Sequence, residues 1–403
     1  MSPFAQRLDR RRFLGLLGAG TLVACEGKRG STASTSPPPT AASSAGPPTT
    51  IASATGRALV VVQLGGGNDA LNTLVPLTGR YHDLRPTIGL ADDTLLPVAG
   101  TTGYGLHPGL KPMTALLDRT AIVASVGFPS PDRSHFVATD DWLSARPGEA
   151  ATTGWLGRYL DATVGRSQST LRAVALGSGT LALLGGDSRP TVVSSPQAFS
   201  VQARGDKTRL IEAWATVGGR PAVDAVAALD IFDELKINAA AAPTTDDAEG
   251  GEITEGLRTA ADLLVSGNGV EIVNVAVGGF DTHSGQPTTH AGLLADLAGG
   301  LSEFFAQIEA AGLADRVMVM TVSEFGRRTA ENASEGTDHG KAGVQFLLGA
   351  GVRPGLIGDV SLTDLDDGDL RAGIDPRTVY ATVLDWLGGS ADDVLGASFP
   401  RLW

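Results

Sequence analysis

A short loop between an apolar run and a long helical pattern holds several side chains that could do chemistry. Residues 278–290 read GGFDTHSGQPTTH and place Asp281, His283 and His290 directly after the apolar run Ile272–Val277. Carboxylate oxygens and imidazole nitrogens gathered in one loop suit a divalent cation such as zinc or manganese. The alternative is a polar turn in which the histidines cap backbone groups. The three residues alone do not decide between the two.

A candidate nucleophile stands at a predicted helix start. The apolar run Thr120–Val126 leads into GFPSPDRSHF, and a helical pattern follows over Val137–Ala145. Ser134 therefore stands where backbone N–H groups and the helix dipole favour an anion. It is either an N-cap residue or a nucleophile beside Arg133, whose guanidinium would hold an oxyanion.

Further charged side chains flank three other apolar runs. They are Asp69, in GGGNDALN after residues 58–64; Glu324 and Arg327, after residues 317–322; and Asp338 and His339, before residues 344–348. The glycines before Asp69 allow a sharp turn and a close approach of the backbone to a ligand.

Strand-like runs alternate with helical patterns along most of the chain. Beyond the runs above, strands are predicted at 171–176 and 190–194, helices at 110–118, 207–217, 222–235, 291–311 and 375–387, and an exposed loop at 238–251. This alternation predicts an α/β fold with a large, mostly parallel central sheet and helices on both faces. Ligands of such sheets bind at the carboxyl ends of the strands, where the candidate side chains are expected to meet. The set would suit two cations about 4 Å apart that activate a hydroxyl group and stabilise a leaving oxygen.

Composition excludes some functions. The 403 residues carry a formal charge of −13, and hydrophobic residues make up 42% of them. A chain of this length and composition can bury a sizeable core. Because an acidic body repels a phosphate backbone, a nucleic acid is not an expected partner.

The first 56 residues are expected to lie outside the folded domain. Residues 1–25 contain Arg10-Arg11-Arg12 before a short apolar run and end in Leu22-Val23-Ala24-Cys25. Paired arginines in this setting resemble a twin-arginine export signal, and the last four residues resemble a lipobox whose cysteine is lipidated. Residues 26–56, rich in Ser, Thr, Pro and Ala, predict a flexible tether. The alternative is a cleaved signal with an incidental cysteine.

Five ordered motifs resemble one bacterial family. GGGNDALNTLVP, RSHF, GGFDTH, SEFGR and GTDHG, behind a twin-arginine signal, look like the domain of unknown function fifteen-oh-one, which is placed in the alkaline phosphatase and sulfatase superfamily. The resemblance covers about residues 57–400 and implies a single alkaline-phosphatase-like α/β domain over 57–403. It implies Asp69 as a metal ligand, Ser134 as the nucleophile, and Asp281 with His283 or His290 as ligands of another metal.

The resemblance leaves the last pair of ligands open. Glu324 with His339 would complete the metal site, or Asp338 and His339 would form the pair themselves. A Cys-x-Pro-x-Arg sulfatase motif is absent from the sequence, which disfavours formylglycine chemistry. The family carries no settled activity, so the resemblance names no substrate.

Together these features predict an exported, metal-dependent hydrolase of phosphate or sulfate esters. The implied cofactors are divalent ions (zinc, manganese or calcium), and the implied substrate is a small-molecule or glycan ester. Ser134 would attack in line while Arg133 or Arg327 holds the non-bridging oxygens. The protein would stand in the periplasm or at the cell surface, anchored through Cys25. The rival hypothesis is a catalytically inactive binding or assembly protein that retains the fold, with one structural metal at most.

Lipidation of Cys25 predicts a fractionation result. Cys25→Ser removes the only thiol in the chain, so the protein is expected to move from the membrane fraction to the soluble fraction because the lipid anchor is lost. Immunoblots of the two fractions measure the shift. Unchanged membrane association of the variant would contradict lipidation at this residue.

Overall fold

The computed structural model describes residues 56–166, 171–193, 212, 216, 250–267 and 269–403. All of them belong to one compact unit of the chain. Eight of the described strands form one sheet, in the order β11-β5-β10-β9-β1-β8-β6-β7. They are β1 (Ala58–Leu64), β5 (Thr120–Val126), β6 (Ala173–Leu176), β7 (Thr191–Val193), β8 (Ile272–Val277), β9 (Val317–Val322), β10 (Gly343–Gly349) and β11 (Gly355–Ile357).

The sheet is mostly parallel. β1 pairs in parallel with β8 and β9, and β5 with β11, whereas β10 runs antiparallel to both of its neighbours, β5 and β9. β1 lies in the centre, where Val60 is in register with Val273 and Val319. Because β1, β5, β8 and β9 point the same way, the loops that follow them meet at one edge of the sheet.

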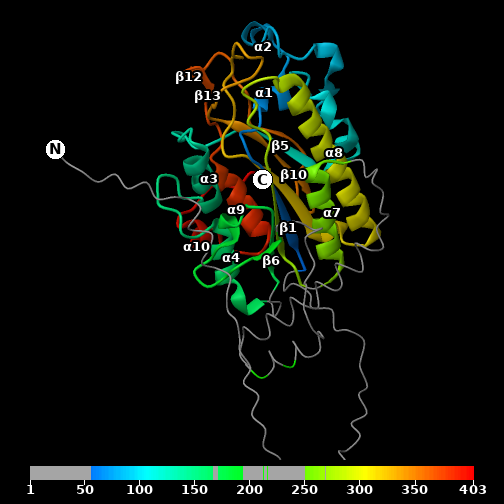
Figure 1. The fold of residues 1–403 in the computed structure, drawn as a ribbon, viewed down its shortest axis with the longest axis vertical. Helices are drawn as coiled ribbons and strands as arrows, with labels where there is room; N and C mark the ends of the chain where they lie inside the picture. Colours follow the sequence, from blue (N-terminus) through cyan, green and yellow to red (C-terminus); the bar gives the residue numbers. More distant parts are fainter. Residues whose placement is uncertain (1–55, 167–170, 194–211, 213–215, 217–249, 268) are drawn as a thin grey trace, which may run out of the picture. The chain divides into compact units, whose positions relative to one another are not determined.

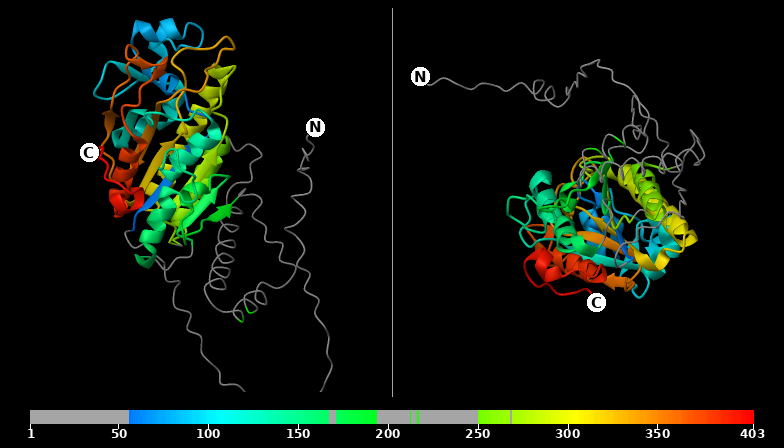
Figure 2. Two further views of the ribbon diagram at one scale, coloured as in Figure 1. Left: turned by 90° about the vertical axis from the view of Figure 1, so that its left-hand side faces the viewer. Right: turned by 90° about the horizontal axis from the view of Figure 1, so that it is seen from below.

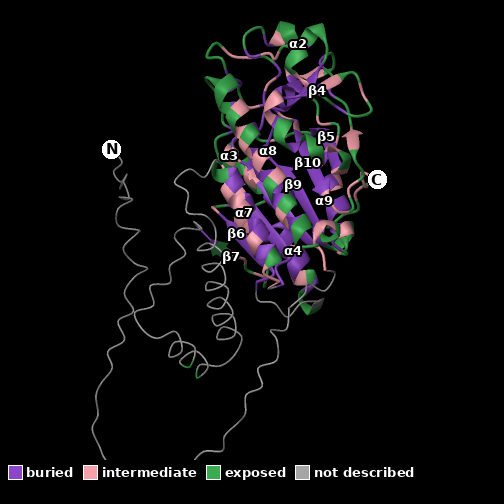
Figure 3. Ribbon diagram, turned by 90° about the vertical axis from the view of Figure 1, so that its right-hand side faces the viewer, coloured by how far each residue is buried: buried purple, intermediate pink, exposed green. Residues whose placement is uncertain are grey.

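Helices cover both faces of the sheet (Figures 1 and 2). Successive side chains of a strand point to opposite faces, so Val60 and Val62 belong to one buried cluster and Leu59 and Val61 to another. The first cluster is shared with α7 (Glu252–Val265), α8 (Gln286–Ala310) and the 3₁₀ helix η2 (Pro108–Arg119). The second is shared with α3 (His135–Ser144), α4 (Trp155–Ala162), α9 (Pro376–Trp386) and α10 (Ala391–Leu395). Figure 3 shows the strands buried between these layers.

Smaller elements lie near the end of the sheet where β1 stops. The helices α1 (Ala70–Thr73) and α2 (Gly79–Leu84) follow β1, and β2 (Leu74–Pro76), β4 (Tyr104–Leu106) and β3 (Leu96–Pro97) form a three-stranded sheet. β12 (Leu365–Asp366) and β13 (Asp369–Leu370) form a hairpin at the same end as α1 (Figure 1). Short 3₁₀ helices complete the described elements at Asp92–Thr94, Val164–Arg166, Leu181–Leu183 and Ala314–Arg316.

The predicted fold class is confirmed, and so are the seven predicted strands to within two residues at each end. Two helix predictions need correction. Residues 110–118 form part of a 3₁₀ helix with Pro112 inside it. α8 begins at Gln286 rather than Ala291, because Pro287 occupies its first turn, where a missing N–H costs no hydrogen bond. His290 therefore lies in a helix and not in the loop.

Several predicted features lie wholly or almost wholly outside the described residues: the export signal and tether, the helices at 207–217 and 222–235, and the loop at 238–251. α4 and α7 were not predicted. Among the described residues, no helix combines the length and the apolar character needed to span a bilayer.

Candidate metal-binding site

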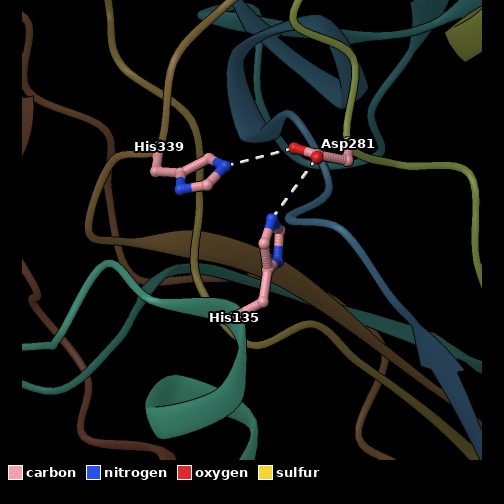
Figure 4. A group of neighbouring side chains, drawn as sticks. All are labelled: His135, Asp281 and His339. Carbon is pink, nitrogen blue, oxygen red and sulfur yellow. Dashed lines mark hydrogen bonds and ion pairs between the residues drawn. The ribbon is translucent and has the colours of Figure 1, made fainter. Parts of the chain in front are cut away.

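Three histidines converge at the edge of the sheet on the carboxylate of Asp281, which makes a cluster of four side chains. Its Oδ1 lies 3.1 Å from Nε2 of His339 and 3.2 Å from Nε2 of His283, and its Oδ2 lies 3.4 Å from Nε2 of His135. Figure 4 shows His135 and His339 pointing at Asp281 from two sides. Asp281 keeps 45% of its side chain exposed, so a small molecule can reach the cluster.

The four residues come from loops that are far apart in the sequence. His135 is the first residue of α3, after β5, and Asp281 and His283 follow β8. His339 lies between β9 and β10. The strand order places these loops side by side, as expected for the carboxyl ends of parallel strands.

Each imidazole is oriented by an acceptor at its other ring nitrogen. Nδ1 of His135 lies 2.8 Å from Glu324 Oε1, and Nδ1 of His283 lies 3.1 Å from Asp338 Oδ1. Nδ1 of His339 lies 2.9 Å from the carbonyl oxygen of Arg133. Because carboxylates and carbonyls only accept hydrogen bonds, each Nδ1 is placed to donate, and each Nε2 is the ring nitrogen that faces Asp281.

The resulting donor set fits a cation. The Nε2 atoms of His283 and His339 lie 2.9 Å apart, and both face the same carboxylate oxygen. In both rings Nε2 is therefore the nitrogen placed to bind one cation at this position. His135, Asp281 and His339 offer ligand atoms within 4.8 Å of one another. Histidines held through their second nitrogen by acceptors are the usual surroundings of a bound metal ion.

Arg327 holds Asp281 in place. Its Nη2 donates to Asp281 Oδ1 at 2.6 Å and to the carbonyls of Gly66 and Phe280. Its Nε and Nη1 donate to the carbonyls of Gly67 and Thr337. Burial of Asp281 opposes its ionisation, but the hydrogen bonds from Arg327 and His339 outweigh burial and lower its pKa to about 2. Arg327 is fully buried, so it does not reach solvent or a substrate.

The glycines after β1 let the loops approach one another. Gly66 has a φ of 119°, and a Cβ there would lie 2.2 Å from the Asp281 amide nitrogen. A Cβ on Gly67 would lie 2.4 Å from the ring of Phe325. The glycines permit a close approach of the Asp281 loop and of Phe325, and the predicted approach to a ligand stays a prediction.

Glu324 and Asp338 lie behind the histidines. Glu324 Oε1 also accepts the backbone N–H of Gly66 at 2.7 Å, and its side chain is almost fully buried. Burial of Asp338 opposes its ionisation, while hydrogen bonds from Asn332 and His283 lower its pKa. The two acids predicted as alternative metal ligands therefore orient two different histidines in the structure.

Asp69 lies outside the cluster. Its carboxylate accepts hydrogen bonds from both Nη atoms of Arg85, at 2.5 and 2.9 Å, from Gln286 Nε2 at 2.5 Å, and from the backbone N–H of Leu71 at 3.1 Å. Four donors use the acceptor positions of a carboxylate. Burial opposes ionisation of Asp69, but Arg85 outweighs burial and lowers its pKa. Asp69 therefore forms a buried ion pair with Arg85, whereas the sequence predicted it as a metal ligand.

His290 also lies apart from the cluster. Its ring is 1% exposed and packs edge-on against His107, and its Nε2 lies 2.9 Å from Asn68 Oδ1. Burial lowers the pKa of His290 to about 4. The ring is therefore neutral and part of the core beneath the loops, away from the four converging side chains.

Ser134 lies between two residues of the site, since the carbonyl of Arg133 contacts His339 and the ring of His135 contacts Asp281. Its backbone N–H donates to Asp132 Oδ1 at 2.6 Å, and its exposed hydroxyl does not cap α3. Arg133, predicted to hold an oxyanion, instead donates from its Nη2 to the carboxylate of Asp369.

His135 is the site residue that the sequence analysis missed as a ligand. The chemistry predicted for RSHF concerns Ser134, which directly precedes His135. A signal was present, because an imidazole directly after a helix-capping position on a strand–loop–helix unit stands at the same edge as Asp281.

The fold and the cluster define an α/β protein with a candidate metal centre at the edge of a mostly parallel sheet. The chain belongs to the family described as "Protein of unknown function (DUF1501)", whose model matches residues 102–399. The motifs RSHF, GGFDTH, SEFGR and GTDHG lie inside this range, and GGGNDALNTLVP precedes it. The resemblance read from the motifs is confirmed. No curated protein sequence matches the chain.

Several solved structures are similar over most of the chain. One is a protein in the alkaline phosphatase superfamily from Vibrio parahaemolyticus, with 8% identity, a TM-score of 0.41, and coverage of 85% of this chain and 69% of that one. A phosphonate monoester hydrolase from Silicibacter pomeroyi has 9% identity, a TM-score of 0.36, and coverage of 85% and 78%. The PsFucS1 sulfatase from Pseudoalteromonas sp. has 12% identity, a TM-score of 0.39, and coverage of 86% and 70%. At such identities none of their activities carries over to this chain.

The orientation of His283 predicts a loss of metal affinity. Asp338→Asn replaces the carboxylate at Nδ1 with a weaker acceptor, so the dissociation constant for zinc is expected to rise about 10- to 100-fold, the usual effect of losing such a partner. Isothermal titration calorimetry with zinc measures it. Asp83→Asn changes an exposed aspartate of α2 and serves as the matched control. Equal affinity of the two variants would contradict an orienting role for Asp338.

The buried histidines predict a loss of stability in acid. Burial lowers the pKa of both His107 and His290 to about 4, against 6.5 for a free imidazole. The unfolded chain therefore takes up protons at a higher pH than the folded one, so stability is full above about pH 6.5 and falls as the pH drops toward about 4. Urea unfolding at stepped pH measures the fall. His290→Gln should flatten it, whereas His82→Gln, at an exposed ring, should not.

Proposed function

We propose that this protein is a metal-dependent hydrolase of phosphate or sulfate esters. The observation that carries the proposal is the convergence of three imidazole Nε2 atoms on Asp281, with each Nδ1 engaged by an acceptor. The cluster is open to solvent. The exposed Ser134, at the start of α3, lies in sequence between Arg133 and His135, and both of these residues contact the cluster. A hydrolase needs this combination of a cation site and a nucleophile.

The donor set favours zinc or manganese over calcium. His135, His283 and His339 supply nitrogen and Asp281 supplies oxygen, and this mixed set is common around zinc. Calcium takes six to eight oxygen ligands, which these residues do not provide. The geometry supports one cation rather than the two first expected, because Asp69 pairs with Arg85 and His290 lies in the core.

Ser134 is proposed as the nucleophile. A cation held by the cluster would supply positive charge that favours the alkoxide of Ser134 and the developing charge on the ester oxygens. The hydroxyl oxygen of Ser134 forms a bond to phosphorus or sulfur as the bond to the ester oxygen breaks, and the alcohol leaves. A water molecule then attacks the same centre and releases the serine. The helix start at Ser134 adds backbone N–H groups that favour an anion.

The place of action is proposed from the first residues of the chain. Paired arginines and the Leu22–Cys25 segment support export by the twin-arginine pathway and anchoring at a membrane. The acidic composition, with a formal charge of −13, supports a small-molecule or glycan ester as the substrate rather than a nucleic acid.

Metal content and ester hydrolysis test the proposal together. The purified protein is expected to hold one equivalent of metal by plasma mass spectrometry and to hydrolyse a 4-nitrophenyl ester. Ser134→Ala should lower kcat by roughly 10³-fold or more, because the nucleophile is lost, while metal content stays unchanged. Ser130→Ala, at an exposed serine of the same loop, is the matched control.

Two results would contradict the proposal. A folded protein that binds no metal would remove the basis of the site. A protein that holds one equivalent of metal but hydrolyses neither phosphate nor sulfate esters would instead support the rival hypothesis, an inactive binding or assembly protein with a structural metal.

A further inference from the structure

Three cationic side chains stand within two residues of the proposed site. Arg133 directly precedes Ser134, Arg328 directly follows Arg327, and Lys341 is two residues after His339. Guanidinium and ammonium groups so placed are the usual means of binding the charged oxygens of a phosphate or sulfate ester. Their partners in the structure therefore bear on what the site accepts.

All three cations contact one acidic hairpin, β12–β13. Arg133 Nη2 donates to Asp369 Oδ2, and Lys341 Nζ donates to Asp366 Oδ2 at 2.7 Å. Arg328 donates to the carbonyl of Asp367, and its Nε lies 3.7 Å from Asp369 Oδ1. One hairpin thus pairs with cations from two loops of the site, the β5–α3 loop with Arg133 and the β9–β10 loop with Arg328 and Lys341.

The hairpin is held firmly enough to act as a fixed partner. Asp367 and Gly368 both have positive φ, at 55° and 79°, which is the backbone of a tight two-residue turn. Leu362 and Leu370 anchor the segment in the core, and the side chain of Asp369 is fully buried. A buried carboxylate requires charged partners, so Asp369 and its two arginines are held together.

The remaining arginines of the site are paired as well. Arg85 binds Asp69, and Arg327 binds Asp281. Every arginine and lysine named around the cluster therefore has a carboxylate partner, and the exposed Asp338 adds a further negative charge. Within the described part of the chain, the side chains around the cluster leave no unpaired positive charge for an anionic substrate, so that charge would come from the proposed cation.

From this pairing we propose that the β12–β13 hairpin sets the charge of the substrate. It selects esters with one negative charge, namely sulfate monoesters or phosphate diesters, over phosphate monoesters with two. The inference rests on the proposed hydrolase function and deepens it. Among the described side chains around the cluster, a second charge would find no cation without a carboxylate partner and would lie among carboxylates, at an electrostatic cost. Asp366 and Asp369 act through the cations they hold and are positioning residues.

The test compares three aryl esters on the metal-loaded protein. At about pH 8 a phosphate monoester carries nearly two charges, whereas an aryl sulfate and a bis-aryl phosphate carry one. Turnover of 4-nitrophenyl phosphate, 4-nitrophenyl sulfate and bis(4-nitrophenyl) phosphate gives kcat/KM for each. Calorimetric binding of phenyl phosphate, phenyl sulfate and diphenyl phosphate gives the same preference without turnover. The sulfate and diester arms separate the two singly charged classes.

The protein is expected to prefer singly charged esters by about tenfold or more in kcat/KM and in affinity. This factor corresponds to the free energy of about one charged hydrogen bond. Asp369→Asn should reduce this preference by a similar factor, because the charges of Arg133 and Arg328 become available. Asp366→Asn, at a half-exposed carboxylate that holds Lys341, should act in the same direction without loss of folding. Asp364→Asn is the matched control, since Asp364 is an exposed carboxylate next to the hairpin in sequence and pairs with Arg371.

The outcomes separate the two proposals. A wild-type preference for the doubly charged ester, in binding or turnover, would overturn the inference, as would an unchanged preference in both Asp366→Asn and Asp369→Asn. If no ester is turned over while binding still follows charge as expected, the proposed hydrolase function fails and the charge selection stands. Melting temperatures of the variants show whether a changed preference reflects loss of structure.

Discussion

One buried guanidinium joins the loops on which the site depends. Arg327 donates to carbonyl groups of the loop after β1 and of the loop after β8, to Thr337 within its own loop, and to the carboxylate of Asp281. A buried charge is tolerated only when it is paired and fully hydrogen-bonded. The three loops must therefore adopt this arrangement together, and Asp281 is both the counter-ion of the core and the centre of the exposed cluster.

A second polar layer sets the distance between the loops that carry His283 and His339. Gln286 donates to Asp69, and its Oε1 accepts from Thr282 at 3.0 Å and from Thr337 at 2.6 Å. Each threonine stands next to or two residues from a histidine of the cluster. Burial thus divides the acidic residues by role, since the fully buried Asp69 supports the framework while the half-exposed Asp281 faces the solvent.

The sequence predicted the fold well because nearly uninterrupted apolar runs such as Ala58–Leu64 mark strands that are covered on both faces. It also predicted Asp281, His283 and His339 as neighbours, because the ends of parallel strands share an edge. It could not show which carboxylate meets which arginine. Asp69 follows a strand, where a metal ligand is expected, but it pairs with Arg85, 16 residues away. His135 was missed because its neighbour Ser134 drew the chemical interpretation.

The first motif, GGGNDALNTLVP, contributes backbone contacts to the site and no ligand, although the resemblance implied Asp69 as one. Gly66 donates its N–H to Glu324, which orients His135, and its carbonyl accepts from Arg327, which holds Asp281. Both contacts need the backbone to come within a distance at which a Cβ would overlap the Asp281 loop. The glycines therefore matter to the cluster through their missing side chains. Asp69 follows these glycines, caps α1 and binds Arg85. It therefore lies after the first strand, where a metal ligand was predicted, but its partner is the guanidinium of Arg85.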